Sequence, residues 1–331
     1  MKIPSRAPGV INLAIIGASQ IAAKVLPSIR TIPMLDVVGV ASARAEAATK
    51  FARDHNILKS YGTYQECFSD SDVQAVYITN LNSEHAQTIR AALVSGKHVL
   101  CEKPMVLTGQ DAIELFSLAS SHNLILMEGL MYRFHHQIKA LRDTLKKGFV
   151  GEIKSIRVRF SFCMFDQENR SKRFSSGAGG GALNDLGCYG VDFINSILGH
   201  ELYPTQIKKI SRYDANDKLF DLETSSILNY PNGVAAEISV CEDSPSLNSW
   251  EVCGSRGSVS ALRFDPQGSS SVPLYLVNDE SEARIVQCEQ GQPFEEEFKN
   301  FAECILGQAQ PFITAKEIIL NSKVLEAIAK A

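Results

Sequence analysis

The sequence predicts an α/β protein in which a doubly wound parallel sheet comes first and an α+β domain with an open, mostly antiparallel sheet follows. In the first third of the chain, short apolar runs alternate with helical patterns, which is typical of a parallel sheet with helices on both faces. From about residue 150 to 290, alternating apolar and polar runs are separated by turn signals, which is typical of antiparallel strands. The 331 residues also exceed the size at which one hydrophobic core usually keeps growing. We place the domains at residues 1–125 and 126–331, and leave open whether the C-terminal helix packs back on the first domain.

The elements expected in the first domain follow from local patterns. Apolar runs predict strands at 11–16, 37–41, 73–79, 98–101 and 124–127. Helical spacing predicts helices at 20–30, 45–54, 83–95 and 109–120, of which 45–54 is rich in alanine. Gly96 is placed to stop the third of these helices.

The second domain is expected to hold strands at 153–162, 224–230, 234–240, 250–255 and 257–264. Pro231, Asn232 and Gly233 form a turn signal between two of them. Helical segments are expected at 187–198, 295–306 and 315–328.

Composition and charge exclude several classes of protein. The formal net charge is −4, and no long basic run is present, so a nucleic-acid surface is not expected. The apolar runs are shorter than a membrane helix requires, and the N-terminus has no signal-peptide pattern. The eight cysteines include no Cys-x-x-Cys pair, so we expect mostly buried free thiols and no metal site. These features indicate a cytoplasmic protein without a membrane partner.

A glycine turn follows the first predicted strand. Gly17-Ala18-Ser19-Gln20-Ile21-Ala22 matches the Rossmann fingerprint G-x-G-x-x-G/A at its first and last positions, with Ser19 in place of the middle glycine. In that fingerprint the first glycine permits a tight turn and the second lets the backbone approach a pyrophosphate. A purely structural strand-turn-helix competes with this interpretation. The position between a strand and a helix favours a dinucleotide site, with Gly17, Ser19, Gln20 and Ile21 as its residues.

The end of the second strand bears on which dinucleotide binds. A carboxylate there would bind the 2′-hydroxyl of NAD, but this chain has Ser42 and Arg44 instead. A guanidinium matches phosphate geometry, so the pair favours NADP(H). NAD(H) stays open, because Arg44 also suits a solvated helix start.

Polar residues also follow the third long strand, between 79 and 85. Loops at the carboxyl ends of parallel strands bind ligands in such sheets. We therefore expect a cofactor contact here, with Ser83 as the helix N-cap. A turn rich in capping residues would look the same. The candidate residues are Thr79, Asn80, Leu81, Asn82 and His85.

Two further segments carry chemistry. In "HVLCEKP", an apolar strand runs directly into Glu102, Lys103 and Pro104, which indicates either a solvated turn or a lysine at the ligand-binding edge. In "GGGALNDLGCYGVD", three glycines precede a helix. Asp185 and Tyr189 share a face if that helix begins early enough to include both. A carboxylate beside a phenol can orient it for proton transfer, although surface or capping contacts are the commoner use of such pairs.

Taken together, these segments resemble the glucose–fructose oxidoreductase/inositol dehydrogenase (Gfo/Idh/MocA) family. The matching features, in chain order, are the glycine turn, Asn82 with His85, "GKHVLCEKP", "MEGLMYRFHHQ", "GEI", "GGGALNDLGCY" and "EEEFKNFAECILG". They cover almost the whole chain, and the combination of "GKHVLCEKP" with "GGGALNDLGCY" is the most specific part. A tyrosine at position 189 looks like the branch of dihydrodiol dehydrogenases and sugar 3-ketoreductases. The serine at position 19 departs from the fingerprint but not from the family, in which this position varies.

The resemblance implies a role for particular residues. Lys103 matches the active-site lysine, Tyr189 the acid/base residue, and Asp185 a carboxylate that contacts substrate or tunes its neighbours. Glu102 and Pro104 are expected to shape the turn and to contact the cofactor. Asn82, His85 and Arg133 are expected near the cofactor, as is Arg173, with Arg170 as its alternative. The substrate-binding set is Lys103, Tyr132, Asn184, Asp185 and Tyr189.

The function implied by the resemblance is hydride transfer between a nicotinamide and a secondary alcohol or ketone of a sugar-like substrate, free or nucleotide-linked. The alternatives are an inactive nucleotide-binding regulator and a trans-dihydrodiol dehydrogenase-like activity. Loops 161–178 and 241–249 are expected to choose the substrate. The family's second-domain sheet implies a homodimer or tetramer. We also expect an unusual bond between Lys103 and Pro104, with the cis form as the candidate.

Overall fold

The computed structural model describes residues 9–163, 174–264, 268 and 272–331, and the chain divides into two compact units. The first unit contains the chain up to Val106, then Gln110–Leu130 and Phe294–Ala315. The second unit contains Leu107–Gly109, Met131–Pro293 and Lys316–Ala331. The predicted division at residue 125 stays a prediction.

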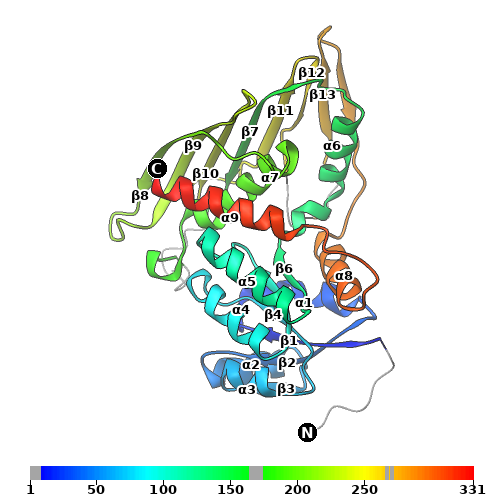
Figure 1. Cartoon of the computed structure of the whole chain (residues 1–331), viewed down its shortest axis with the longest axis vertical. Coiled ribbons are helices and arrows are strands. Elements are labelled where there is room, and N and C mark those ends of the chain that lie inside the picture. Colours follow the sequence, from blue (N-terminus) through cyan, green and yellow to red (C-terminus); the bar gives the residue numbers. More distant parts are fainter. Residues whose placement is uncertain (1–8, 164–173, 265–267, 269–271) are drawn as a thin grey trace. The chain divides into compact units, whose positions relative to one another are not determined.

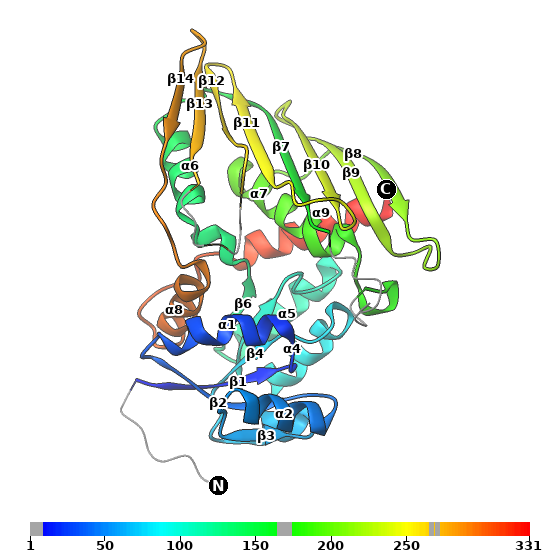
Figure 2. The same cartoon turned by 180° about the vertical axis from the view of Figure 1, so that it is seen from behind.

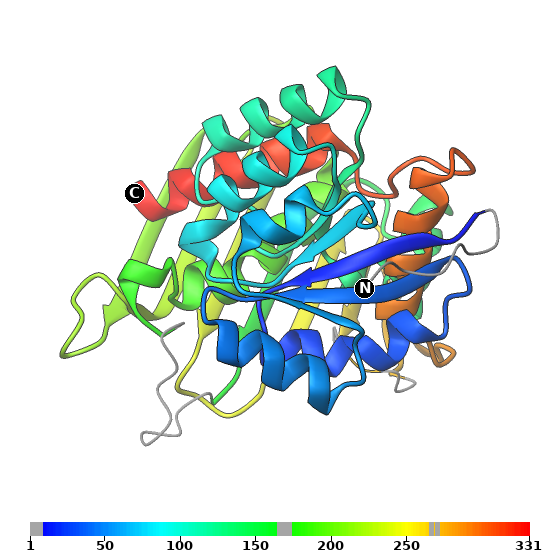
Figure 3. The ribbon, with the colours of Figure 1, turned by 90° about the horizontal axis from the view of Figure 1, so that it is seen from below.

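The first unit is built on a parallel sheet of six strands in the described residues, in the order β3-β2-β1-β4-β5-β6. The strands are β1 (Ile11–Ile16), β2 (Leu35–Ala41), β3 (Lys59–Tyr61), β4 (Ala75–Ile78), β5 (His98–Glu102) and β6 (Leu126–Gly129). The helices are α1 (Gln20–Arg30), α2 (Ala45–Asp54), α3 (Tyr64–Ser69), α4 (His85–Val94), α5 (Gly109–Ser121) and α8 (Pro293–Ile305). Helices cover both faces of this sheet (Figure 3), as in the predicted doubly wound fold. The strand order reverses between β1 and β4, which is where ligands bind in such folds.

The strands of the first unit are apolar on both faces because helices cover both. Leu13 and Ile15 of β1 point to the face opposite that of Ala14, and all three are fully buried. The predicted bounds of β1, α1 and α2 are confirmed. Gly96 ends α4 with a positive φ of 76°, as predicted.

In the first unit, a helix cap and the bounds of several strands differ from the prediction, and two elements were missed. Ser83 is not the N-cap of α4: a 3₁₀ turn, η1 (Asn82–Glu84), leads into the helix, and the cap residue is Glu84, which makes no side-chain cap bond. The missed elements are β3 and α3. β3 has only three residues, too few to show an alternating pattern.

The second unit is built on a sheet of eight strands in the described residues, in the order β14-β13-β12-β11-β7-β10-β9-β8. β7 (Ile153–Ser161) and β10 (Ala235–Cys241) are parallel, and all other neighbours are antiparallel, so the prediction of a mostly antiparallel sheet is confirmed. The other strands are β8 (Gln206–Tyr213), β9 (Asp221–Asn229), β11 (Ser249–Gly254), β12 (Gly257–Ala261), β13 (Leu274–Asn278) and β14 (Ala283–Val286). Three helices, α6 (His136–Lys146), α7 (Cys188–Leu198) and α9 (Ala315–Lys330), lie against one face of this sheet (Figure 1). Seen from behind, the strands lie in front of these helices (Figure 2).

Four elements of the second unit were missed from the sequence. β8 is a largely exposed edge strand with adjacent lysines at 208 and 209, which interrupt the alternation. β14 is exposed along its whole length, so it has no apolar face to recognise. β13 and α6 are the other two. In α6, Ile138 and Leu141 are three residues apart and both buried, a spacing that indicates a helix.

Two expectations about cysteines and membranes can be compared with the structure. All eight cysteines are free thiols and six are buried, as predicted; Cys163 is exposed and Cys253 is partly exposed. Within the described ranges, no helix combines the length and apolarity needed to cross a bilayer.

Candidate active site

The glycine turn closes tightly against the end of β4. Gly17 has a φ of 105°, and a Cβ on it would lie 2.8 Å from Oγ1 of Thr79, so only glycine fits. The Ser19 hydroxyl accepts a hydrogen bond from the Ala22 amide at 3.1 Å and donates one to Oγ1 of Thr79 at 2.8 Å. Ser19 is therefore the N-cap of α1 and ties the turn to β4. Thr79 completes the link by donating to the Gly17 carbonyl at 2.9 Å.

The residues of this turn fit the pyrophosphate of a dinucleotide. A helix N-terminus presents backbone N–H groups and the positive end of the helix dipole, which together favour an anion. The first turn of α1 contains no acidic residue that would repel one. Gln20 is exposed and Ile21 is half-buried, so both lie where a ligand could touch them.

At the end of β2, Ser42 and Arg44 lie together. The Arg44 amide donates to the Ser42 hydroxyl at 3.4 Å. The Arg44 side chain is exposed, and in the described part of the chain it makes no hydrogen bond or ion pair. Its guanidinium is thus available for an anionic group.

Sequence reasoning missed Tyr64 at this edge. The Asn80 side chain and the backbone of Ala43 lie near enough to act on its pKa, so Tyr64 lies by the segments that follow β2 and β4. Burial raises the pKa of Tyr64, so its hydroxyl keeps its proton at neutral pH. A tyrosine at the first position of a short helix gives no sequence signal for this role.

The segment that follows β4 is held from both sides. The Asn80 amide nitrogen donates to Glu84 Oε2 at 3.0 Å and to Thr88 Oγ1 at 2.9 Å. His85 is fully buried, with Nδ1 2.9 Å from the Pro104 carbonyl and Nε2 3.3 Å from the Asn80 carbonyl. His85 therefore joins this segment to the turn after β5, and its predicted contact with the cofactor stays a prediction. Leu81 and Asn82 are half-buried at the same edge.

Lys103 lies at the carboxyl end of β5 and is half-buried. The Lys103–Pro104 peptide bond is cis, as the sequence suggested. The Lys103 amide donates to Glu102 Oε2 at 3.4 Å, and Glu102 Oε1 accepts from the Tyr77 hydroxyl at 2.5 Å. Beyond the proline, the Met105 amide donates to Glu128 Oε1 at 2.8 Å. Carboxyl groups thus hold the backbone on both sides of Pro104.

In the second unit, the last glycine of the triplet lies directly against a buried aspartate. Gly181 has a φ of 116°, and a Cβ on it would lie 2.1 Å from Oδ1 of Asp221. Asp221 Oδ2 accepts from the Leu183 amide at 2.8 Å and from the Thr224 hydroxyl at 2.6 Å. Asp221 therefore caps the helical segment that contains the candidate catalytic residues, although burial raises its pKa.

That helical segment begins earlier than predicted. A π-helical stretch, η5 (Leu183–Gly187), continues directly into α7, so Asp185 and Tyr189 lie in one helical segment. Short π-helical stretches occur often at functional sites. Asp185 and Tyr189 are 1% and 3% exposed. The Tyr189 hydroxyl lies 3.8 Å from the Met131 sulfur, and its ring packs edge-on against Tyr132, with centroids 5.7 Å apart.

Asn184 is the third predicted residue in this stretch. Its amide nitrogen donates to the Gly179 carbonyl at 3.1 Å, so it links η5 to the glycine triplet. The predicted substrate contact of Asn184 stays a prediction.

Tyr132 and Arg133 bind Asp192, one helical turn after Tyr189. Tyr132 is fully buried and its hydroxyl donates to Asp192. Arg133 reaches both oxygens of Asp192 at 3.0 and 3.1 Å, and Glu317 Oε1 at 2.8 Å. Burial opposes the charge of Arg133, but Asp192 and Glu317 raise its pKa above the ordinary value. This network fixes the helix that carries Tyr189, while the predicted ligand contacts of Tyr132 and Arg133 stay predictions.

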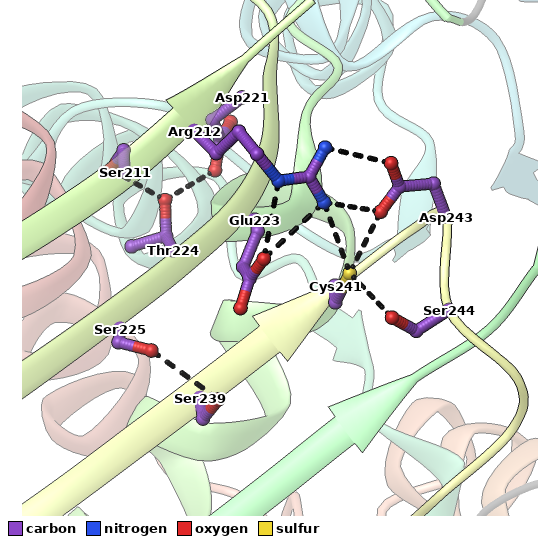
Figure 4. A network of polar contacts seen from close by, with 10 residues as sticks. All are labelled: Ser211, Arg212, Asp221, Glu223, Thr224, Ser225, Ser239, Cys241, Asp243 and Ser244. Atoms are coloured by element: carbon purple, nitrogen blue, oxygen red, sulfur yellow. Dashed lines mark hydrogen bonds and ion pairs between the residues drawn. The ribbon is translucent and has the colours of Figure 1, made fainter.

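The loop assigned to substrate choice, 241–249, is anchored at its start. Arg212 of β8 contacts Glu223 and both carboxylate oxygens of Asp243, at 2.7 and 2.5 Å (Figure 4). The Cys241 thiol donates to Asp243 Oδ1 at 3.0 Å. Arg212 holds the pKa of Asp243 below its usual value, so the ion pair persists at neutral pH. Most of the other loop assigned to substrate choice, 161–178, lies outside the described residues, as do Arg173 and its alternative Arg170.

A six-stranded parallel sheet with this strand order and a glycine turn at its switch point is typical of dinucleotide-binding domains. Comparison with family models agrees: residues 11–130 match the model of the oxidoreductase family with an NAD-binding Rossmann fold, and residues 138–260 match the GFO/IDH/MocA C-terminal domain. The chain belongs to the Gfo/Idh/MocA family of NAD(P)-dependent oxidoreductases, as the sequence predicted.

Individual relatives cover almost the whole chain. The trans-1,2-dihydrobenzene-1,2-diol dehydrogenase of Sus scrofa is 30% identical, over 97% of this chain and 96% of the relative. The dTDP-3,4-didehydro-2,6-dideoxy-α-D-glucose 3-reductase of Actinomadura kijaniata is 27% identical, over 96% and 94%. A crystal structure of a 3-ketoreductase from Actinomadura kijaniata with NADP and TDP-benzene has a TM-score of 0.89 and 26% identity, and covers 97% of each chain.

Proposed function

We propose that this protein transfers a hydride between C4 of the nicotinamide of NADP(H) and a secondary alcohol or ketone carbon of a sugar-like ring compound. The observation that carries the proposal is Lys103, which lies at the ligand-binding edge of the sheet on a turn held by Glu102 and Glu128. The bound cofactor supplies the hydride, and the protein supplies position and proton transfer.

In the reducing direction, the substrate oxygen gains negative charge as the hydride reaches its carbon. Tyr189 then donates its phenolic proton to that oxygen, which leaves an alcohol and a tyrosinate. The ammonium group of Lys103 stabilises the developing charge. In oxidation the same groups act in reverse. Donation of the proton by Lys103 itself remains an alternative assignment. Asp185, four residues before Tyr189, is proposed to contact the substrate or to tune the phenol.

The choice of NADP(H) over NAD(H) rests on Ser42 and Arg44. An exposed guanidinium without a partner in the described residues suits a 2′-phosphate. The similar 3-ketoreductase structure contains NADP, which supports the same choice.

The names of the relatives support the proposed substrate class. Their names describe ring compounds that carry oxygen on neighbouring carbons, as a dihydrobenzenediol in one case and a dTDP-linked deoxysugar in the other. Solved variants of the Actinomadura reductase replace a lysine or a tyrosine, the two residue types on which this mechanism depends. A dihydrodiol is kept as the second candidate substrate, because that dehydrogenase is 30% identical over almost its full length.

The proposal is tested with Lys103→Ala and Tyr189→Phe, each assayed for NADP(H) binding and for turnover with nucleotide sugars, free sugars and dihydrodiols. We expect both variants to bind cofactor and to lose turnover by about 10²-fold or more, the usual size of a general-acid or charge-stabilising contribution. If both variants keep near wild-type turnover, the assignment is wrong. A regulator without turnover would show a change in bound-NADPH fluorescence on adding a ketosugar, but no oxidation of the cofactor.

We also propose that the protein assembles with copies of itself through the face of the eight-stranded sheet opposite α6, α7 and α9. On this face Arg157 pairs with Glu251 at 2.8 Å, and Ile210 and Ile227 are exposed. A flat sheet face with exposed aliphatic side chains among charges suits burial against an identical face.

A further inference from the structure

Three carboxyl groups from separate elements gather behind the turn that carries Lys103. Glu102 ends β5, Glu128 lies in β6, and Glu297 lies in α8, a helix about 190 residues further along the chain. Two of the three hold the backbone of the turn: Glu102 accepts a hydrogen bond from the Lys103 amide, and Glu128 accepts one from the Met105 amide. The mechanism proposed above gives Glu297 no task.

Glu297 is 1% exposed, and its Oε1 has no hydrogen-bond partner in the described residues. The adjacent Phe298 packs edge-on against Tyr77, with centroids 4.9 Å apart, and Tyr77 donates to Glu102. The residue next to Glu297 in α8 thus packs on the tyrosine that is hydrogen-bonded to Glu102. An ionised carboxylate with no donor and no cation at this depth would be strongly destabilised.

Two further carboxyl groups act electrostatically on Glu297. They are Glu102 of β5 and Glu128 of β6, both acidic. Burial and these two carboxylates raise the pKa of Glu297 well above its usual value. The titratable residues near Glu102 also include Lys103, Tyr77 and Cys101. Burial and Glu102 raise the pKa values of Tyr77 and Cys101. Among the described residues the three carboxyls do not form a metal-binding group.

We propose that Glu297 is an uncharged carboxylic acid that positions Lys103 through Glu102 and Glu128. With Glu297 neutral, these two carboxyl groups can hold the Lys103 and Met105 amides without a third charge beside them. Ionisation of Glu297, or loss of its polar group, would repel or release them and let the turn shift. The inference rests on the proposed function, because it takes Lys103 as the reacting lysine.

The first test asks whether Glu297 is protonated, and it needs no substrate. Infrared difference spectra would be recorded at neutral pH for wild type against Glu297→Gln, in H₂O and D₂O. We expect a carboxylic-acid C=O band that shifts in D₂O and is missing from Glu297→Gln. The matched control is Glu296→Gln, which changes an exposed neighbour on the same helix and should keep the band. If wild type lacks the band, the inference is overturned.

The second test asks whether Glu297 acts on Lys103. Glutamine at position 297 keeps the shape of a protonated glutamate and its ability to donate a hydrogen bond, without a charge. Leucine at the same position removes the polar group. With NMR of lysine labelled at its ε-position, and Lys103→Gln for assignment, we expect Glu297→Leu to move the Lys103 signal and Glu297→Gln to leave it in place. The kcat of Glu297→Gln should stay within about 3-fold of the wild-type value. The kcat of Glu297→Leu should fall by about 10²-fold, because a small displacement of a reacting group has an effect of this size. The KM for NADPH should change little.

The outcomes separate the two proposals. If wild type turns over no candidate substrate, the proposed function fails, while the infrared and NMR results still decide the role of Glu297. The positioning role is overturned if Glu297→Leu leaves both the Lys103 NMR signal and kcat unchanged. It is also overturned if kcat falls as far in Glu297→Gln as in Glu297→Leu.

Discussion

At the scale of single residues, backbone hydrogen bonds on both sides of Pro104 hold the turn that carries Lys103. Glu102 and Glu128 fix the amides on either side of Pro104, and His85 bonds to the Pro104 carbonyl. The sequence placed Lys103 at the edge of the sheet because strand and motif are contiguous. It could not reveal Glu297, since α8 lies about 190 residues further along the chain and a glutamate on a helix looks like a solvated one.

Glu297 predicts a pH dependence of stability. Its pKa is raised in the folded state relative to the ordinary value of about 4.3 for an unfolded chain. The folded state therefore holds this proton more tightly, so the stability from Glu297 is full below the unfolded pKa and is lost as pH rises toward the folded one. Urea unfolding over a pH series should show that Glu297→Gln flattens this decline. A wild-type decline that Glu297→Gln leaves unchanged would contradict the prediction.

We expect Arg44 to determine the preference for NADPH over NADH. Replacing it with alanine removes the guanidinium proposed to bind a 2′-phosphate, a charge-assisted contact. Fluorescence titration should show NADPH affinity reduced by about 10-fold, the effect of roughly 1.4 kcal/mol, with NADH affinity almost unchanged. Arg53→Ala, which removes an exposed arginine at the end of the same helix, serves as the control. Equal loss of affinity for both cofactors would argue against a 2′-phosphate contact.

At the scale of elements, the segment from Gly179 to Leu198 shows how far the sequence could be followed. The pattern indicated a helix that carries Tyr189, but not the π-helical turn that begins it, because Asp221 closes that turn from a strand about 40 residues later. In the first unit the long apolar strands and α1 were predictable, since helices cover both faces and leave continuous apolar runs. Short or exposed strands such as β3 and β14 had no such signal.

We expect the hydrogen bonds of Asp221 to contribute to the free energy of unfolding, because they hold that turn. Asp221→Ala leaves the buried Leu183 amide and Thr224 hydroxyl without their acceptor, which should cost about 1–3 kcal/mol of unfolding free energy. Asp221→Asn keeps an acceptor and should cost less. Chemical denaturation measures both, and kcat should fall more than cofactor affinity, because Tyr189 follows this turn. An alanine variant as stable and as active as wild type would rule out the capping role.

At the scale of the whole molecule, the eight-stranded sheet presents helices on one face and charged, serine-rich strands on the other. Ile210 and Ile227 lie exposed among these side chains. The family resemblance suggested that this face pairs with a second copy of the chain, and the exposed aliphatic residues give that proposal a physical basis.

We therefore expect a substitution at Ile227 to change the oligomeric state. Ile227→Asp places a charge on the proposed interface and should shift light-scattering mass toward the single chain. Val94→Asp, an exposed aliphatic position on α4 of the first unit, is the matched control and should leave the mass unchanged. A wild-type protein that already runs as a single chain would refute self-association.

The central claim is hydride transfer to a sugar-like carbon, with proton transfer by Lys103 and Tyr189. The most direct measurement uses NADPH deuterated at the transferring position of nicotinamide C4, incubated with ketosugars, and mass spectrometry of the product. We predict one deuterium on the new carbinol carbon with wild type, and a rate lowered by about 10²-fold or more in Lys103→Ala and Tyr189→Phe. Wild-type turnover without label in the product, or undiminished label transfer in both variants, would contradict the mechanism.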